Sequence, residues 1–588
     1  MGWCIKWGFG MLAAVMSFPA SSLAAIDVLV DSRAGVQKIS PYIYGKNITG
    51  INDTEKDAQD ETKIASEDST IRRMNEIGFR FFRANSGNNA TRYNWRKKLT
   101  VHPDWYNNVY EHDWDITAKT IQDKLPGANA MYALQLSGYA ASTTANNFND
   151  WDFYQTNGAW AKSTLDLAGG GEVSADGQTA LKTGDYRLYN EEWPADSTVA
   201  ILNHWKDNLK LDMKRFEYWS MDNEMEIWDG THSDLPLTVT QQFLVERYLD
   251  VAKKARAAWK DVKLTGPVTA NEWQWCGVKS DPNAGEDRNY CWLEYFIKKV
   301  AEAQKTSGVK LLDVLDIHWY PAEKSYEERI NWHRVFFDTT YVYSGANGIK
   351  NVNGGWDDSI NKEFIFKRLN DWMNAYFGEN HGIGLGLTET DITSDDAMLT
   401  ALVYASFLGT FMDHGVELFS PWGWGAGMDE VAHLFIRYGH DFRVASTSNN
   451  DSLVSAYSSV TEALDSMTII LVNRSEKESQ SVNLSVENFD ANSAAKTLTL
   501  SGLVGETFVS HTKNALQSGN AVVAAGKISL ELPAKSITAI LLTNRNPNAI
   551  PKRAVRAVPK KTGTPRYVNG RVAKKNRNAS HPMPTFAK

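Results

Sequence analysis

The chain has 588 residues, of which 43% are hydrophobic and 22% are charged, a composition typical of globular proteins that excludes a disordered or fibrous chain. A net charge of -8 does not favour nucleic-acid binding, and three Cys residues are too few for a disulfide scaffold or several zinc sites. The 21 Trp and 23 Tyr residues are numerous, and flat aromatic rings both fill cores and bind the apolar faces of sugars.

The first 25 residues have the pattern of a signal peptide. Lys6 precedes an apolar run over residues 7–16, and Pro19 and a stretch of small residues lead to Leu23-Ala24-Ala25. We predict that residues 1–25 are removed and that the protein is secreted or periplasmic. No later segment has the ~18 uninterrupted apolar residues that a membrane span needs.

Residues 41–435 alternate between short apolar runs and helical patterns. A broad apolar stripe over residues 238–259 is the clearest helix, with Lys and Arg on its opposite face. Eight strand-helix units predict an α/β fold, a (β/α)8 TIM barrel. The predicted strands span residues 41–47, 79–86, 130–139, 215–224, 263–268, 312–320, 382–390 and 416–425.

The pattern differs on either side of this barrel. Residues 436–545 contain short alternating runs separated by Asn, Gly and Lys turns without a long helix, which predicts an antiparallel β-sandwich. The segment 26–40 also reads as strand, and we expect it to join that sandwich. Within the barrel, the long interval 140–200 contains Gly169-Gly170-Gly171, and we expect an insertion over the barrel mouth.

The C-terminal segment 546–588 has 11 Lys and Arg residues, six Pro residues and no Asp or Glu. This composition predicts a disordered basic tail. Such a tail could attach the protein to an anionic polymer or surface, or could be a solvated extension without a partner.

Two Cys residues remain after the loss of Cys4 with the signal peptide. Cys276 and Cys291 are an even pair in an oxidising compartment, and we predict a disulfide between them. The loop that it closes is short, so its effect is expected to be local.

Two glutamates end strands that face each other across the predicted barrel. Glu224 ends the fourth strand in Met221-Asp222-Asn223-Glu224, and Glu389 ends the seventh in Leu387-Thr388-Glu389. Barrel enzymes place their chemistry at this rim. Glycoside hydrolysis needs such a pair, one group to protonate the leaving oxygen and the other to attack or stabilise the sugar carbon. A separation of ~5 to 5.5 Å would indicate double displacement with retention of configuration.

Other polar and aromatic residues at the predicted strand ends are candidates for substrate binding. Asn223 could donate to a sugar 2-hydroxyl, and Tyr320 could donate to Glu389 and keep it ionised. The candidates are Arg83, Asn88, Trp95, Asn223, Trp228, His318, Trp319, Tyr320, Trp422 and Trp424.

Other reaction classes have little support. The 12 His residues include no H-E-x-x-H pair and no zinc spacing, and no G-x-S-x-G motif is present. We expect no catalytic metal or cofactor, although loop Asp residues could bind a structural calcium ion. A non-catalytic polysaccharide-binding protein on the same scaffold would keep the aromatic residues but would not need both glutamates.

Several motifs resemble glycoside hydrolase family 44, the endoglucanase and xyloglucanase family of the retaining barrel clan. They run in the family order across residues 40–545. The resemblance implies a barrel with a β-sandwich built from both chain ends, Glu224 as acid/base and Glu389 as nucleophile. The motifs are Ile43-Tyr44-Gly45-Lys46-Asn47, Asn88-Asn89-Ala90-Thr91-Arg92-Tyr93-Asn94-Trp95, Asp222-Asn223-Glu224 with Trp228 and Thr231-His232, Leu315-Asp316-Ile317-His318-Trp319-Tyr320-Pro321, and Leu387-Thr388-Glu389.

The chain also departs from the family pattern. Met225 follows the acid/base position, where the family usually has Pro, and Arg83-Ala84-Asn85-Ser86-Gly87-Asn88 stands where an Arg-Trp-Gly-Gly-Asn run is typical. These changes affect the sugar-contacting rim more than the chemistry. A β-1,4-glucan or xyloglucan is therefore the first candidate substrate, and another β-linked polysaccharide, such as a marine galactan, is the second.

Overall fold

The computed structural model describes residues 24–48, 67–102, 107–148, 166–176, 179–322, 324–343, 352, 355, 364–503, 505, 507–547, 566–568 and 571–573. The predicted signal peptide lies outside these residues, apart from Ala24 and Ala25. Of the predicted basic tail, the described part is 546–547 and two paired strands, β25 (Arg566–Val568) and β26 (Arg571–Ala573).

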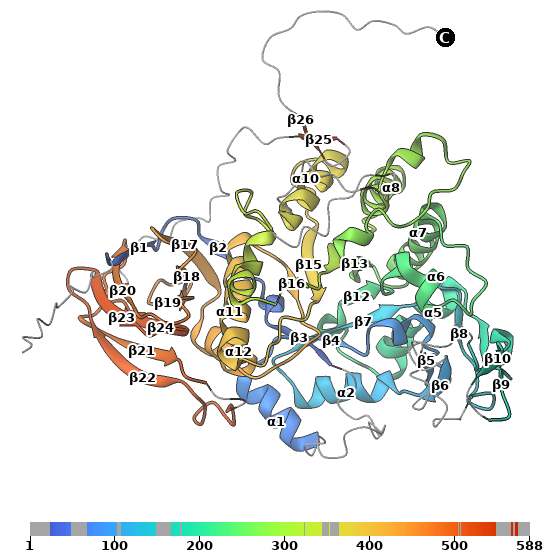
Figure 1. Cartoon of the computed structure of the whole chain (residues 1–588), viewed down its shortest axis with the longest axis horizontal. Helices are drawn as coiled ribbons and strands as arrows, with labels where there is room; N and C mark the ends of the chain where they lie inside the picture. The colour runs from blue at the N-terminus through green and yellow to red at the C-terminus, as the bar shows by residue number, and fades with distance from the viewer. Residues whose placement is uncertain are drawn as a thin grey trace, which may run out of the picture.

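Eight parallel strands form the predicted barrel (Figure 1). Asn47 closes the barrel between the first and last strands, because its backbone N–H donates to Pro421 O at 3.3 Å and its side-chain amide donates to Ser420 O at 2.7 Å. In spatial order the strands are β3 (Gly45–Ile48), β4 (Phe81–Ala84), β7 (Asn129–Leu134), β12 (Tyr218–Met221), β13 (Lys263–Thr269), β14 (Val314–His318), β15 (Gly384–Glu389) and β16 (Leu418–Phe419).

The barrel interior is a packed core. Apolar side chains from five strands fill one layer, as expected when branched and aromatic residues alternate with outward-facing ones. Helices surround it: α1 (Glu67–Ile77), α2 (Trp114–Lys124), α5 (Ala195–Asn203), α7 (Gln241–Ala258), α8 (Trp292–Ser307), α10 (Ile365–Phe377), α11 (Ala397–His414) and α12 (Met428–Tyr438). The layer residues are Phe81, Met131, Tyr218, Val314 and Leu418.

Two connections of the barrel carry extra structure. The hairpin of β5 (Leu99–His102) and β6 (Asn108–Glu111) follows β4. The predicted insertion contributes β8 (Tyr139–Ala141) paired with β11 (Asn190–Glu192), and β9 (Glu172–Val173) paired with β10 (Ala180–Lys182).

The second unit, at the left of Figure 1, is a β-sandwich that uses both ends of the folded chain. The strand pairs within residues 436–545 are antiparallel, as predicted, whereas β1 from the other end of the chain pairs antiparallel with β17 and parallel with β20. Its strands are β1 (Ile26–Asp31), β2 (Gln37–Lys38), β17 (Phe442–Ser448), β18 (Val454–Val460), β19 (Ser466–Asn473), β20 (Gln480–Glu487), β21 (Ala494–Leu500), β22 (Gln517–Val522), β23 (Lys527–Leu532) and β24 (Ser536–Thr543).

Helix α11 joins the two units. Arg474, which follows β19, is buried and donates to Ser406 Oγ of α11 at 2.9 Å and to Tyr457 OH at 3.2 Å. Gly409 of α11 lies against the Tyr457 ring, where an added Cβ would be 2.3 Å from the nearest ring carbon. The sandwich is therefore packed directly onto a barrel helix.

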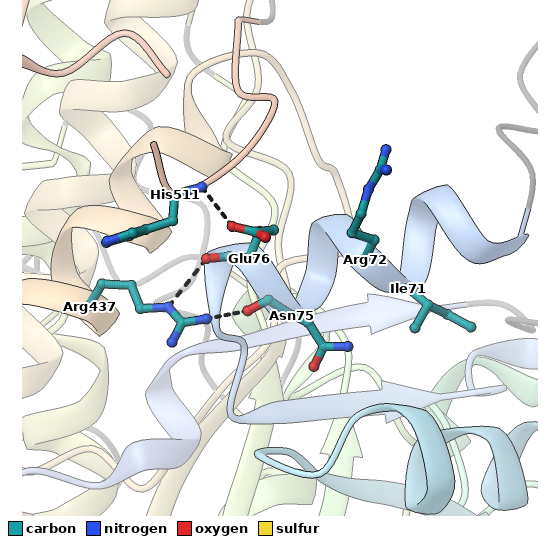
Figure 2. Close-up of a pocket in the computed structure, with 6 residues that line it drawn as sticks. All are labelled: Ile71, Arg72, Asn75, Glu76, Arg437 and His511. Atoms are coloured by element: carbon teal, nitrogen blue, oxygen red, sulfur yellow. Dashed lines mark hydrogen bonds between the residues drawn. The ribbon is translucent and has the colours of Figure 1, made fainter. Parts of the chain in front are cut away.

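A cavity of about 550 Å³ lies between α1, α12 and the loop that carries His511 (Figure 2). Arg437 donates to the backbone oxygen of Glu76 at 3.2 Å, and the backbone N–H of His511 donates to the Glu76 carboxylate at 2.8 Å. None of the site residues predicted from the sequence lines this cavity.

Two further features concern the predicted export. Cys276 and Cys291 form a disulfide in the loop between β13 and α8. Within the described ranges, we find no helix that is both long and apolar enough to cross a membrane.

Candidate active site

Glu224 lies just beyond β12 in a strained backbone. Its φ of 41° is in the left-handed region, as is the φ of 66° at Asp222, and such angles in non-glycine residues require strong surrounding contacts. The backbone N–H of Glu224 donates to Val268 O of β13 at 2.9 Å. Its side chain remains partly accessible, with 15% of its surface exposed. The turn therefore directs one carboxylate into the barrel mouth.

The buried carboxylate of Asp222 supplies those contacts. It accepts hydrogen bonds from Thr91 Oγ1 at 2.6 Å, from the backbone N–H of Leu136 at 2.6 Å and from that of Asn223 at 2.9 Å. Burial raises the pKa of Asp222 to about 7, and these hydrogen bonds act in the opposite direction. These hydrogen bonds connect the end of β12 to the segments that follow β7 and β4.

Glu389 ends β15 and is held from two sides. Arg83 of β4 donates to its Oε1 at 2.5 Å, and Tyr320 donates its hydroxyl hydrogen to Oε2 at 2.7 Å. Burial favours the neutral acid, but the charges of His318 and Arg83 and the two hydrogen bonds outweigh it, so the pKa of Glu389 lies below its usual value. These charges and hydrogen bonds therefore favour the ionised form of Glu389.

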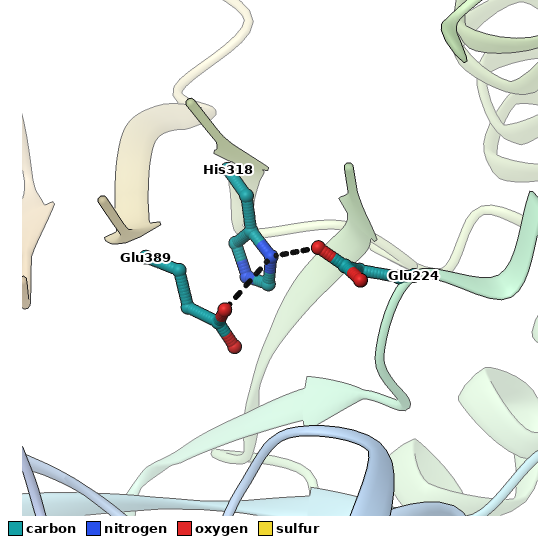
Figure 3. A group of neighbouring side chains, drawn as sticks. All are labelled: Glu224, His318 and Glu389. Carbon is teal, nitrogen blue, oxygen red and sulfur yellow. Dashed lines mark hydrogen bonds and ion pairs between the residues drawn. The ribbon is translucent and has the colours of Figure 1, made fainter. Parts of the chain in front are cut away.

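His318, at the end of β14, lies between the two glutamates (Figure 3). Its Nδ1 is 2.8 Å from Glu224 Oε1 and 3.5 Å from Glu389 Oε2. Burial would lower the pKa of His318, but the two carboxylates raise it above its usual value. One oxygen from each glutamate and one His318 nitrogen all lie within 4.8 Å of one another.

Asparagines complete the floor of the site. Arg83 donates to Asn223 Oδ1 at 2.8 Å and to Asn47 Oδ1 at 3.1 Å, and Asn223 donates to Asn88 Oδ1 at 2.9 Å. The chain brings these groups together from β3, β4 and β12. Arg83 thus fixes the nucleophile candidate and the residue preceding Glu224 with one guanidinium group.

The trio of Glu224, His318 and Glu389 has donor atoms that could ligate a metal ion. However, the Arg83 guanidinium already occupies Glu389 Oε1, and the neighbouring carboxylates favour a protonated His318. Two cationic side chains at this distance oppose the approach of a divalent cation. The charge arrangement suits acid/base chemistry better than metal binding.

The predicted aromatic residues divide into three groups. Trp422 is 42% exposed at the rim beside Gly87. Trp95 and Trp424 are half-buried, and their indole N–H groups donate to Ser197 O at 2.8 Å and to Asp429 Oδ1 at 2.9 Å.

Trp228 and Trp319 are fully buried, which corrects the expectation that they stack on a sugar. Trp228 instead donates to the backbone oxygen of Asn223 at 3.1 Å, beneath the site. Trp319 packs among Trp332, Phe336 and Phe407, between the strand and the outer helices.

Sequence reasoning did not single out Asp316 or assign Asn47 to the site. Asp316 is fully buried beneath His318 on β14 and accepts from Thr388 Oγ1 at 2.8 Å. Burial raises the pKa of Asp316 to about 6. The signal was available, because Asp316 and His318 are two residues apart and so face the same side of a strand.

Comparison with known proteins finds a family model that matches part of the chain. The family model described as glycoside hydrolase family 44 matches residues 101–323, a range that includes Glu224 and His318. The match agrees with the family resemblance seen in the sequence motifs.

The individual relatives have low sequence identity to this chain. The chain is 22% identical over 518 residues to beta-mannanase/endoglucanase A of Caldicellulosiruptor saccharolyticus, covering 79% of this chain and 35% of that protein. It is 22% identical over 511 residues to endoglucanase A of Paenibacillus lautus, covering 79% and 66%. The chain thus spans less than two thirds of either relative.

A solved structure shows the same fold. CelM2, a bifunctional glucanase-xylanase from a metagenome library, superposes with a TM-score of 0.68 at 20% identity, over 88% of this chain and 99% of that one. The predicted barrel with an added β-sandwich is confirmed by this likeness.

Proposed function

We propose that this protein is a secreted, retaining endo-β-glycanase that hydrolyses a β-linked polysaccharide by double displacement. The observation that carries the proposal is the approach of Glu224 and Glu389, whose nearest oxygens lie within 4.8 Å of each other. Carboxyl groups about 5 Å apart favour direct attack by one of them, because a wider gap is needed to admit water in an inverting reaction.

In the first step, Glu389 attacks the anomeric carbon while Glu224 donates a proton to the departing glycosidic oxygen. The products are a glycosyl ester on Glu389 and a shortened polysaccharide with a new hydroxyl group. In the second step, Glu224 takes a proton from water, which attacks the same carbon and releases Glu389. Together, the two steps return each carboxyl group to its starting state.

The surrounding residues support these roles. Arg83 and Tyr320 stabilise the charge of Glu389 before attack and after its release. His318 holds the Glu224 side chain at 2.8 Å, and its positive charge stabilises the ionised Glu389, which lies 3.5 Å away. Asn223, fixed by Arg83 and Asn88, is placed to donate to a sugar hydroxyl, a contact that strengthens in the transition state.

The nucleophile is tested with Glu389→Ala and azide. We expect a loss of hydrolysis by a factor of about 10⁴ or more, because no covalent intermediate can form, and rescue by azide on an activated aryl glycoside. The product should be a glycosyl azide of inverted configuration. Hydrolysis that persists without azide would contradict the role of Glu389.

The acid/base is tested with Glu224→Gln. We expect a loss of about 10²–10⁴-fold on substrates with poor leaving groups and a much smaller loss on aryl glycosides whose leaving group needs no proton. An equal loss on both substrates would contradict proton donation by Glu224. Circular dichroism of both variants checks that the fold is kept.

The relatives are named as endoglucanases, a mannanase and a glucanase-xylanase, and these names limit the range of candidate substrates. We propose a β-1,4-glucan or a xyloglucan-like polymer first and another β-linked polysaccharide, such as a marine galactan, second. Incubation with a panel of plant and algal polysaccharides, followed by sizing of products, decides between them. Mixed oligomers indicate internal cleavage, and binding without cleavage would indicate the non-catalytic alternative.

The cellular location is proposed from the N-terminal pattern and the Cys276–Cys291 disulfide, a bond that persists in oxidising compartments. Mass spectrometry of the exported protein should show a new N-terminus after Ala25. An intact Met1 on the mature protein would contradict export by this signal.

A further inference from the structure

Two tryptophan rings face solvent in the described part of the chain, and both lie in loops at the same end of the barrel. Trp273 is 39% exposed, four residues after β13, and Trp422 is 42% exposed, three residues after β16. Single exposed apolar residues are common on protein surfaces. An exposed indole on each of two loops at the catalytic end is a more specific pattern. Trp422 was among the residues predicted to bind substrate, and Trp273 was not.

The loop that carries Trp273 is firmly anchored. Trp275 is buried, donates to Ala270 O at 3.3 Å and lies 5.0 Å from the Arg368 guanidinium. The Cys276–Cys291 disulfide closes the same loop. A ring presented on such a loop loses little conformational entropy when it binds a ligand.

The same loop contacts the catalytic residues through Asn271. The backbone N–H of Tyr320 donates to Asn271 Oδ1 at 2.6 Å, and the Tyr320 hydroxyl donates to Glu389 at 2.7 Å. Trp273 is therefore two residues from a group that positions the nucleophile's hydrogen-bond donor. This connection places the Trp273 loop at the border of the reacting centre.

The two exposed rings lie on loops that follow strands adjacent to different glutamates. Strand β13 is the direct neighbour of β12, which leads to Glu224, whereas β16 is the direct neighbour of β15, which carries Glu389. The Trp422 ring covers Gly87, where an added Cβ would be 3.0 Å from its Cη2 atom. During the first step the bond breaks between the carbon on Glu389 and the oxygen beside Glu224. Sugars on the Glu224 side are therefore those that leave.

We propose that Trp273 is a sugar-stacking platform for the leaving, aglycone part of the polysaccharide. Its ligand is a β-linked pyranose unit beyond the scissile bond, bound through its apolar face. Trp422 then serves the part that is retained on Glu389. The proposal deepens the proposed function and rests on it for the assignment of the two sides.

The test compares two substrates that share the same retained sugars. One is an aryl β-glycoside, which has no sugar on the leaving side, and the other is an oligosaccharide of the preferred polymer. Trp273→Ala should lower kcat/KM on the oligosaccharide about tenfold and leave the aryl glycoside within about twofold, since one stacked ring contributes roughly a factor of ten. Trp273→Phe should recover part of the loss. Trp422→Ala, the matched variant, should lower kcat/KM on both substrates.

A second readout is partitioning of the glycosyl-enzyme between water and an added sugar acceptor, because the acceptor binds on the leaving side. Trp273→Ala should lower the ratio of transfer to hydrolysis several-fold. A similar loss on both substrates, or an unchanged transfer ratio, would overturn the placement of Trp273.

Affinity electrophoresis in gels with the polysaccharide separates this inference from the proposed function. Weaker retardation of Trp273→Ala than of wild type supports the platform even if the wild type proves not to hydrolyse the polymer, an outcome that overturns only the proposed function. Equal retardation together with equal kcat/KM on the oligosaccharide overturns the platform.

Discussion

Glu389 accepts two hydrogen bonds of different strength, and this difference decides how sensitive the site is to each donor. Arg83 is charged, fully buried and bound to Glu389, Asn223 and Asn47, so its loss would disturb three partners. Tyr320 donates one neutral hydrogen bond to Glu389 Oε2. Tyr320 is therefore the donor whose removal isolates one contribution to the ionisation of the nucleophile.

For Tyr320→Phe we expect kcat/KM to fall about tenfold, the equivalent of one hydrogen bond of about 1–1.5 kcal/mol. The pKa of Glu389 is held below its usual value partly by this hydrogen bond, so its removal raises that pKa. The acidic limb of the pH dependence of kcat/KM should then move to higher pH. Tyr376→Phe, which removes a 2.8 Å hydrogen bond to Glu294 between α10 and α8, is the control and should leave the profile in place. An unchanged acidic limb in Tyr320→Phe would contradict the role of Tyr320.

At the level of single elements, the sequence could predict the barrel strands and the residues at their ends. Apolar runs bounded by polar residues identify all eight barrel strands, and Glu224 and Glu389 follow from their positions at the ends of the fourth and seventh strands. Side-chain direction was the missing information for the aromatics. In the run from His318 to Tyr320, alternation turns His318 and Tyr320 toward the site and Trp319 toward the outer helices. The left-handed turn at Glu224 has no signal in local composition, because tertiary contacts such as those of Asp222 impose it.

The C-terminal turn of α11 carries a half-buried aspartate, Asp413, that has no part in the proposed chemistry. Asp413 Oδ1 has no hydrogen-bond partner among the described residues, and the Arg443 side chain donates instead to the backbone oxygen of Asp413 at 2.9 Å. Burial raises the pKa of Asp413 from 3.8 to about 7. A carboxyl group whose pKa is raised by folding binds a proton in the folded state that the unfolded state has lost, so stability decreases as pH rises between these values.

Asp413→Asn should therefore stabilise the protein at pH 8 by about 1–3 kcal/mol, and this gain should shrink toward pH 4. Urea unfolding at pH 5 and pH 8 measures the difference. The exposed Asp261→Asn is the control and should give similar differences at both pH values. A gain for Asp413→Asn that does not change with pH would exclude titration of Asp413 as its cause.

At the scale of the whole molecule, the barrel and the sandwich are constrained to fold together. The chain begins in the sandwich with β1, forms the barrel, and returns to complete the sandwich from β17 onward. Residues of β18, β19, β21 and β24 share a continuous apolar core with the barrel helices, and Arg474 is buried against α11. The sandwich therefore acts as a structural support for α11 and, through it, for β15 and β16 at the site.

Gly409→Ala tests this coupling. In the middle of a helix, replacing Gly with Ala usually stabilises by about 1 kcal/mol. At Gly409 the new methyl group would lie 2.3 Å from the Tyr457 ring, and overpacking of this kind costs about 1–3 kcal/mol. We expect a lower Tm in a single calorimetric transition, because strain between α11 and β18 destabilises the barrel and the sandwich at once.

Gly230→Ala, at a site where nothing lies within 4 Å of the added carbon, is the matched control and should not lower Tm. Two separate transitions in the Gly409→Ala variant, with only one of them shifted, would show that the barrel and the sandwich unfold independently.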